Sequence, residues 1–346
     1  MPEEPDGPAS RLTPHASRPH RLLIVRLSAM GDIVHALPLA ENARRAGAEV
    51  GWVVERGYVG LLEGNPAISR LFPADTRAWR RSPFSSKSRS ELSRLRAGLL
   101  DFAPEATIDA QGLWKSVLLA RLARAPVVGL AARHRRERTS ALLVDRAVRL
   151  DPETEHVVDQ NLSLLTPLKI PVAAAAPDAR YLLDVPREDA DRFAADLPRP
   201  FALLHPGSSH AEKAWGEDGY AALARRLFER AGLSAAISWG PGDEKRADRL
   251  ARLLPEAARL PLLDAAGLAH VIGRAALFVG GDTGPVHLAD ALGVSTLALF
   301  SPASSRRNVP RRNRPYRGAW LRYDQATDLE TVVAKAIEAA RCPAAP

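Results

Sequence analysis

The sequence contains a single cysteine, Cys342, among 346 residues. An intrachain disulfide is therefore impossible, and zinc or iron–sulfur sites built from several cysteines are excluded. No run approaches the roughly 20 apolar residues that a membrane-spanning helix needs, and no secretory signal is visible. Residues 1–20 lack any apolar stretch and are predicted to form a disordered tail. Together these absences predict a soluble, cytoplasmic protein.

Lysine and aromatic residues are also scarce. Six lysines stand against 42 arginines, the formal net charge is +8, and aromatic residues make up 5% of the chain. The basic excess favours an acidic partner, either nucleic acid, an anionic membrane surface or a phosphorylated small molecule. Because aromatics for base stacking are few and no nucleic-acid-binding motif is present, nucleic acid is the least supported of the three.

Short apolar runs alternate with helical patterns along the chain. The runs Arg21–Leu27 and Glu49–Val54 are typical of buried strands, and a helix predicted to begin near Asp32 lies between them. Strand, helix and strand in this order predict a parallel sheet. The pattern stops at the linker Pro171–Asp178 and restarts with the strand Phe201–His205. The predicted fold class is therefore α/β, with two Rossmann-like parallel-sheet domains that face a cleft.

Polar segments follow the carboxyl ends of predicted strands, where open α/β sheets bind ligands. The first is SAMGDIVH, residues 28–35. Asp32 in this segment has two interpretations: it is the N-cap of the next helix, or it is a general base beside the cleft. His35 is either functional or a packed histidine. The segment does not match GxGxxG, and the chain contains no GxxxxGK[ST] motif, so a dinucleotide fingerprint and a P-loop are unsupported.

The second polar segment, DAQGLWKS, spans residues 109–116 and contains Gln111 and Lys115. It is either an anion site or a turn followed by a solvated lysine. The third, HPGSSHAEKAW, spans residues 205–215. Its flexible glycine, two serines and Lys213 suit a diphosphate, although a loop lysine is more often only solvated.

The fourth segment is a glycine-rich turn, VGGDTGPVH, at residues 279–287, followed by a helix with Pro285 at its first position. Exposed N–H groups at such a helix start favour phosphate binding. The alternative is a tight turn capped by Asp282 or Thr283. A further acidic pair, Asp243 and Glu244, follows another strand and either holds ribose hydroxyls or simply begins the next helix.

Two basic segments, residues 77–96 and 306–317, are either solvated faces or binding surfaces for an acidic acceptor. The second segment has six arginines and no acidic residue between residues 306 and 317. On the alternative that nucleic acid is the partner, these two segments are the surface that would bind it.

In their order and spacing, the segments SAMGDIVHALP, WVVERGY, DAQGLWKS, HPGSSHAEKAW and GGDTGPVHLADALG resemble glycosyltransferase family 9. Within the family they are most similar to its lipopolysaccharide heptosyltransferase I branch. The similarity spans roughly residues 21–340. It implies a GT-B fold, ADP-L-glycero-β-D-manno-heptose as donor, and inversion at the anomeric carbon without a metal or other cofactor. The implied acceptor is the Kdo of Kdo-lipid A, reached by peripheral attachment to the anionic cytoplasmic face of the inner membrane. A heptosyltransferase II-like or other sugar-nucleotide transferase is the alternative within the family.

The resemblance also implies roles for individual residues. Asp32 corresponds to the general base, and Lys213 corresponds to the lysine that stabilises the departing ADP. The implied donor-binding residues are Ser208, Ser209, Lys213, Glu244 (or Asp243), Leu263, Asp282, Thr283, Gly284 and His287, and the implied acceptor-binding residues are Arg77, Arg80, Arg81, Gln111 and Lys115.

The resemblance divides the chain after the predicted tail into three parts. Residues 21–175 form an N-terminal acceptor-binding domain, and residues 176–325 form a C-terminal domain that binds the nucleotide sugar. Residues 326–346 form a helix that packs back on the N-terminal domain. One departure from the family pattern is the stretch SSRRNVPRRNRP, residues 304–315, which replaces a glycine-rich segment.

Overall fold

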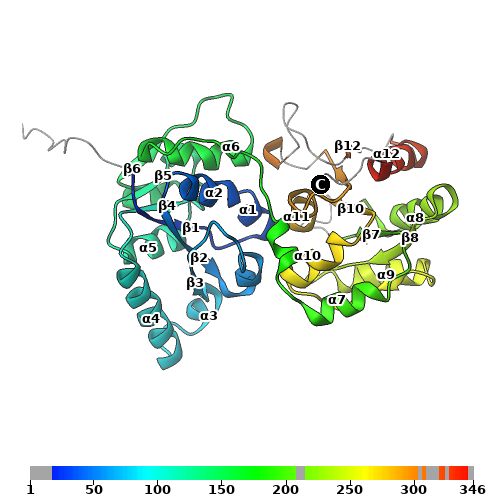
Figure 1. Ribbon diagram of the computed structural model, residues 1–346, viewed down its shortest axis with the longest axis horizontal. Helices are drawn as coiled ribbons and strands as arrows, with labels where there is room; N and C mark the ends of the chain where they lie inside the picture. Colours follow the sequence, from blue (N-terminus) through cyan, green and yellow to red (C-terminus); the bar gives the residue numbers. More distant parts are fainter. Residues whose placement is uncertain (1–17, 208–214, 303–305, 309–318, 324–326, 342–346) are drawn as a thin grey trace, which may run out of the picture.

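The computed structural model describes residues 18–207, 215–302, 306–308, 319–323 and 327–341; most of the predicted tail lies outside these ranges. The described residues form two parallel six-stranded sheets, one in each half of the molecule (Figure 1). The spatial orders are β3-β2-β1-β4-β5-β6 and β12-β11-β10-β7-β8-β9. Taken from the first strand of each half, both sheets have the same doubly wound order. The predicted pair of Rossmann-like domains is confirmed.

The strand bounds show how short the described strands are. The first sheet contains β1 (Arg21–Val25), β2 (Glu49–Glu55), β3 (Arg70–Ala74), β4 (Ala106–Asp109), β5 (Val127–Leu130) and β6 (Arg146–Val148). The second sheet contains β7 (Phe201–His205), β8 (Ser234–Ile237), β9 (Ala258–Arg259), β10 (Leu277–Gly281), β11 (Thr296–Phe300) and β12 (Ala319–Arg322).

Helices lie between most consecutive strands. Those of the first half are α1 (Met30–Val34), α2 (Leu37–Arg45), α3 (Thr76–Arg81), α4 (Ser86–Phe102), α5 (Trp114–Leu122) and α6 (Val157–Leu162). Those of the second half are α7 (Glu188–Ala195), α8 (Glu217–Ala231), α9 (Glu244–Leu253), α10 (Ala265–Gly273), α11 (Gly284–Ala291) and α12 (Leu329–Arg341).

The single helix predicted to begin near Asp32 is two helices, α1 and α2. Pro38 lies at the start of α2. Its ring nitrogen carries no hydrogen, so it cannot donate to the carbonyl four residues earlier and continue α1. The break leaves α1 as a single short helix at the carboxyl end of β1, where it faces the second half of the molecule.

The two halves share one apolar core. A single cluster of buried residues includes Ile24 of β1 and Ile33 of α1 together with Val286 of α11 and Phe278 of β10. Helices α1 and α11 meet at the centre of the molecule (Figure 1). The contact between these two helices therefore fixes how the carboxyl ends of the two sheets face each other.

The prediction that residues 326–346 pack back on the first half is wrong for the described part of that segment. Helix α12 packs on β10, β11, β12 and α8, all in the second half (Figure 1). Its buried residues Val332, Val333, Ala336 and Ala339 belong to the same cluster as Leu297 and Leu299 of β11. The apolar side of α12 packs on one face of the second sheet and covers it.

Candidate active site

A cavity of about 1030 Å³ lies between the two domains. Its walls come from segments that follow β1, β2 and β3 in the first sheet and β7, β8, β9, β10 and β11 in the second. The strand order of each sheet reverses between β1 and β4, and between β7 and β10. Ligands of open α/β sheets bind at such switch points. The sequence-predicted residues Asp32, Leu263, Asp282, Thr283, Gly284 and His287 all line this cavity.

Asp32 is the third residue of α1, and the N-cap of that helix is Ala29, so the N-cap interpretation is wrong. Its carboxylate instead forms an ion pair with Arg26, with 2.6 Å between Oδ1 and Nη2. Asp32 has a side chain 41% exposed toward the cavity, whereas the Arg26 side chain is only 4% exposed. Arg26 also donates to the carbonyl oxygen of Ala110, at the end of β4. A buried, doubly engaged guanidinium thus holds one oxygen of a solvent-accessible carboxylate that lines the cavity.

The glycine-rich turn after β10 forms the opposite wall. Gly284 is the first residue of α11 and Pro285 the second, one position later than predicted. Thr283 is at the N-cap, but its hydroxyl donates to the carbonyl of Gly281 at 3.3 Å instead of capping the helix. Pro285 has no N–H, the Val286 N–H donates to the Thr283 carbonyl oxygen at 3.2 Å, and no side chain among the described residues caps this helix start. The other N–H groups of this first turn suit an anionic ligand.

Asp282 and His287 interact across this turn. The distance between Asp282 Oδ1 and His287 Nε2 is 3.7 Å, and both side chains are buried. Asn308 donates to the same Asp282 oxygen at 3.4 Å. The Asp282 carboxylate therefore links the turn to His287 of α11 and to Asn308.

Three histidines gather where the domains meet. The rings of His35 and His287 are 4.3 Å apart between centroids, and His156 lies 5.9 Å from His35. Burial, followed by the proximity of His287, lowers the pKa of His35 well below its usual value. His35 is therefore neutral at neutral pH, and it both packs against the other two rings and lines the large cavity.

The acidic pair at the start of α9 is divided by the structure. Asp243 lines the cavity, and its side chain is 21% exposed. Glu244 has a side chain 64% exposed and lies 3.7 Å from Arg259, between Oε1 and Nη2. A Cβ atom on Gly207 would approach Asp243 Oδ2 to 2.6 Å, so this carboxylate points at the loop that follows β7. Of the two acids, Asp243 is the one that lines the cavity.

His205 ends β7 on the same wall. It is buried, and its Nδ1 lies 3.1 Å from the hydroxyl oxygen of Ser238. Burial lowers the pKa of His205 to about 4. The ring is therefore neutral at pH 7 and leaves the wall of the cavity uncharged at this point.

A second cavity, of about 290 Å³, adjoins Asp32 on its other side. The predicted acceptor residues Gln111 and Lys115 line it. Gln111 uses its Oε1 to accept from the backbone N–H of Leu27 at 2.8 Å, so it holds the loops after β1 and β4 together. Its walls also contain four guanidinium groups and two carboxylates, those of Arg26, Arg135, Arg136, Arg307, Asp32 and Asp109. This small cavity is the most basic part of the site.

The arginines predicted in the first basic segment are spread over α3. Arg77 lines the large cavity. Arg80 and Arg81 are exposed on the next turn and are not among the residues that line either cavity in the described structure. The predicted residues Ser208, Ser209 and Lys213 lie outside the described residues.

Arg26 and Arg136 were not among the residues predicted for the site, and Arg307 was covered only by the alternative that the basic segment 306–317 binds an acidic acceptor. Arg26 comes directly after the apolar residues LLIV of the predicted strand. A charge at the end of a buried strand was the signal that could have marked it as a site residue. Arg136 and Arg307 lie within arginine-rich stretches, and nothing local distinguishes them from their neighbours.

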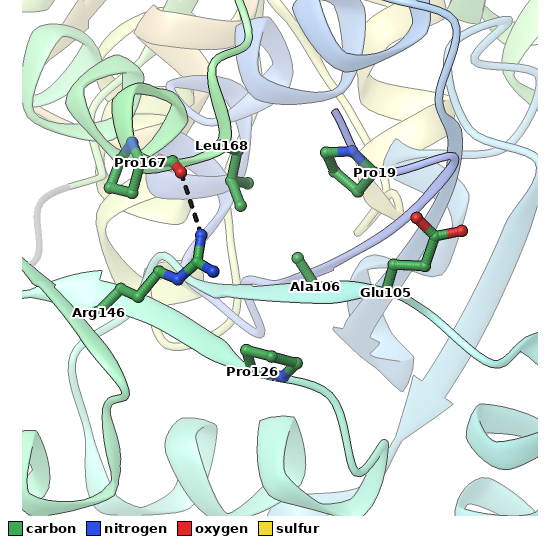
Figure 2. Close-up of a pocket in the computed structure, with 7 residues that line it drawn as sticks. All are labelled: Pro19, Glu105, Ala106, Pro126, Arg146, Pro167 and Leu168. Atoms are coloured by element: carbon green, nitrogen blue, oxygen red, sulfur yellow. Dashed lines mark hydrogen bonds between the residues drawn. The ribbon is translucent and has the colours of Figure 1, made fainter. Parts of the chain in front are cut away.

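A pocket of about 180 Å³ lies at the opposite edge of the first sheet, near the starts of β1, β4, β5 and β6. Arg146 extends across it and donates to the carbonyl of Pro167 at 3.2 Å (Figure 2). Its other lining residues include Pro19, Pro126 and Glu105. Because ligands bind at the carboxyl ends of parallel strands, this pocket is not part of the candidate site.

Within the described ranges, no three His, Cys, Asp or Glu side chains are grouped so as to bind a metal ion. In the same ranges, no helix is both long and apolar enough to span a membrane.

Comparison with known proteins agrees with this geometry. The family model described as glycosyltransferase family 9 (heptosyltransferase) matches residues 92–332. Lipopolysaccharide heptosyltransferase 1 of Pseudomonas aeruginosa is 37% identical over 290 residues, covering 82% of this chain and 79% of the relative. The protein of the same name from Escherichia coli K12 is 30% identical, covering 82% and 88%.

Solved structures are similar over almost the whole chain. Escherichia coli heptosyltransferase WaaC with ADP-2-deoxy-2-fluoro heptose has a TM-score of 0.72 at 28% identity, covering 92% of this chain and 98% of that one. Escherichia coli ADP-heptose lps heptosyltransferase II has a TM-score of 0.71 at 16% identity, with the same coverage, and supports the fold alone.

Proposed function

Because the chain belongs to glycosyltransferase family 9, we propose that it transfers a heptosyl group from ADP-heptose to a sugar acid of the lipopolysaccharide inner core. The observation that carries the proposal is the large cavity, in which Asp32 of the first domain faces the α11 turn of the second. A transferase needs an acceptor-activating group and a diphosphate site on opposite sides of one space. Here each group comes from a different domain, as a GT-B enzyme requires.

The donor is proposed to lie against the second domain. The N–H groups at the start of α11 and Thr283 would hold the diphosphate, and Leu263 would pack against the adenine. Lys213, known here only from the sequence, would offset charge on the departing ADP. For the ribose, the geometry favours Asp243 over Glu244.

The reaction is proposed to be a single displacement. The acceptor hydroxyl oxygen attacks the anomeric carbon of the heptose, and the bond from that carbon to the diphosphate oxygen breaks. The configuration inverts, ADP leaves with the electron pair, and Asp32 accepts the hydroxyl proton. Arg26 holds one carboxylate oxygen of Asp32, so the other is oriented toward the incoming hydroxyl.

The acceptor is proposed to be the Kdo residue of Kdo-lipid A, bound with its carboxylate in the small basic cavity beside Asp32. Lys115 and Arg136 lie in that cavity, and Arg77 lines the neighbouring part of the large one. Guanidinium groups bind carboxylates through two parallel hydrogen bonds.

Because this acceptor carries lipid, we also propose peripheral attachment to the cytoplasmic face of the inner membrane. Phe84, between α3 and α4, is 85% exposed and is flanked by Arg80, Arg81 and Lys87. An exposed aromatic ring among basic side chains suits an anionic lipid surface. Sedimentation with vesicles of phosphatidylglycerol, compared with phosphatidylcholine alone, tests this attachment. Phe84→Ser should weaken sedimentation, and equal sedimentation with both lipids would count against the proposal.

The decisive experiment is ADP release from ADP-heptose with delipidated Kdo-lipid A, in EDTA and without added metal. Asp32→Asn should lower the rate roughly 10²- to 10⁴-fold while ADP affinity is retained. Asp101→Asn, an exposed carboxylate on α4, is the matched control. Lys213→Ala should weaken both donor binding and turnover. Donor binding without acceptor-dependent release would point to another acceptor, and no donor binding would refute the proposed donor.

A further inference from the structure

One residue that lines the small acceptor cavity, Arg307, comes from the second domain. Arg307 belongs to the short helical turn η7 (Arg306–Asn308), which follows β11 of the second sheet. It nevertheless lines the cavity formed by Arg26, Asp32 and Lys115 of the first domain. A side chain from the donor-side domain therefore completes the space proposed for the acceptor.

The charges around Arg307 indicate what this space binds. Arg307 is within electrostatic range of Asp32, which attracts it, and of Arg26, which repels it. Lys115 and Arg136 add two more positive groups to the same walls. Asp32 and Asp109 also line the cavity, where they pair with Arg26 and Arg135, but the cations on its walls outnumber the carboxylates and favour an anionic ligand. The cavity therefore has the chemistry of a carboxylate or phosphate site.

The residue after Arg307 faces the other cavity. Asn308 lines the large cavity and donates to Asp282 Oδ1 at 3.4 Å, in the turn proposed to hold the donor diphosphate. Adjacent residues of one short turn thus contact the donor turn and the acceptor cavity. Any adjustment of the Asp282 turn on donor binding would be transmitted to the position of Arg307.

We propose that Arg307 binds the acidic group of the acceptor from the donor-side domain, and that Asn308 couples its position to occupancy of the Asp282 turn. The proposal rests on the proposed heptosyl transfer. Arg307 is then a specificity-determining residue, because it selects a carboxylated acceptor sugar over a neutral one. It also makes the acceptor site complete only when the two domains are in contact.

The first test compares Arg307→Gln and Arg307→Lys with Arg322→Gln, which removes an exposed charge from β12 of the same domain. Arg307→Gln should raise the acceptor KM about tenfold or more without changing ADP affinity, since a hydrogen bond between charged groups is lost. Arg307→Lys should have an intermediate KM because it keeps the charge but not the planar fork. Equal acceptor KM values for Arg307→Gln and Arg322→Gln would overturn the proposal.

A second readout separates recognition from a merely structural effect. The enzyme should prefer the carboxylated acceptor over its carboxamide analogue, and Arg307→Gln should lose that preference while retaining the rate on the carboxamide. An undiminished preference in Arg307→Gln would contradict the assignment.

A third measurement does not depend on catalysis. Free Kdo is titrated into the protein in the presence and absence of ADP, and binding is followed by NMR. Weaker Kdo binding by Arg307→Gln, and loss of the ADP effect in Asn308→Ala, support the proposal even if heptosyl transfer is not observed. Unchanged Kdo binding in Arg307→Gln refutes it, whatever the transfer assay gives.

Discussion

Gly31 of α1 and Gly284 of α11 pack against each other at the domain contact. A Cβ atom on Gly31 would lie 3.3 Å from Gly284 Cα and 2.9 Å from His287 Cδ2. A Cβ atom on Gly284 would lie 2.7 Å from Met30 Cβ. Only residues without side chains allow the two helix starts to approach so closely. This approach brings Asp32, the residue after Gly31, beside the turn that contains Thr283.

Gly284→Ala is expected to separate the two helix starts, because backbone and Met30 Cβ atoms leave no room for a methyl group. A displacement of this kind misplaces Asp32 relative to the donor and should lower kcat about 10²-fold. Steady-state kinetics measure the effect, and circular dichroism establishes that the fold is retained. Gly98→Ala on α4 is the control, since its new Cβ would make only ordinary contacts. Equal activity of the two variants would show that the close approach is not needed for turnover.

Arg26→Lys keeps a positive charge beneath Asp32 but cannot reach both Asp32 and the carbonyl of Ala110 at once. The carboxylate then loses its fixed orientation, so kcat should fall roughly tenfold or more while ADP affinity is unchanged. Titration calorimetry measures the ADP affinity and the ADP-release assay measures kcat, so the two together show which of them changes. A variant that loses donor affinity instead would place Arg26 in the donor site and not beside the base.

Asp243→Asn should weaken ADP binding about tenfold, because the carboxylate that lines the cavity would no longer accept from ribose hydroxyls with full charge. Glu244→Gln is the matched comparison on the adjacent residue, whose carboxylate is near Arg259. Calorimetric titration with ADP ranks the two variants. A larger loss in Glu244→Gln would mean that α9 shifts when donor binds and presents Glu244 to the ribose.

Protein stability should fall as the pH is lowered from about 6.5 toward 4. Burial lowers the pKa of His205 to about 4, whereas the same ring titrates near 6.5 in the unfolded chain. Between these values the unfolded state binds more protons, so acid favours unfolding, by up to about 3 kcal/mol for this residue. His35, whose pKa is also lowered by burial, acts in the same direction.

Urea denaturation at pH 7 and at pH 4.5 measures this dependence. His205→Asn removes the titrating ring while keeping a polar atom near the Ser238 hydroxyl, so the difference between the two pH values should shrink. An unchanged difference would assign the pH dependence to other groups.

The sequence alone determined the two parallel sheets and the position of Asp32 and the Asp282 turn after their strands. These features depend on local patterns: branched apolar runs form buried strands, and glycine and small polar residues form the turns that follow them. The resemblance to a family added the roles of these residues. The interpretation of Asp32 as a helix cap failed because Ala29 occupies the N-cap position and the Asp32 carboxylate pairs with Arg26.

Only the tertiary structure decided which residues of distant segments meet. It paired Arg26 with Asp32, placed Asp243 rather than Glu244 on the cavity wall, and packed α12 on the second sheet. It also brought Arg307 into the pocket of the other domain. The basic segment 306–317 is evident in the sequence, but nothing local marks which of its six arginines enters that pocket. Its role is set by long-range packing, which depends on how two complete domains fit together through Gly31 and Gly284.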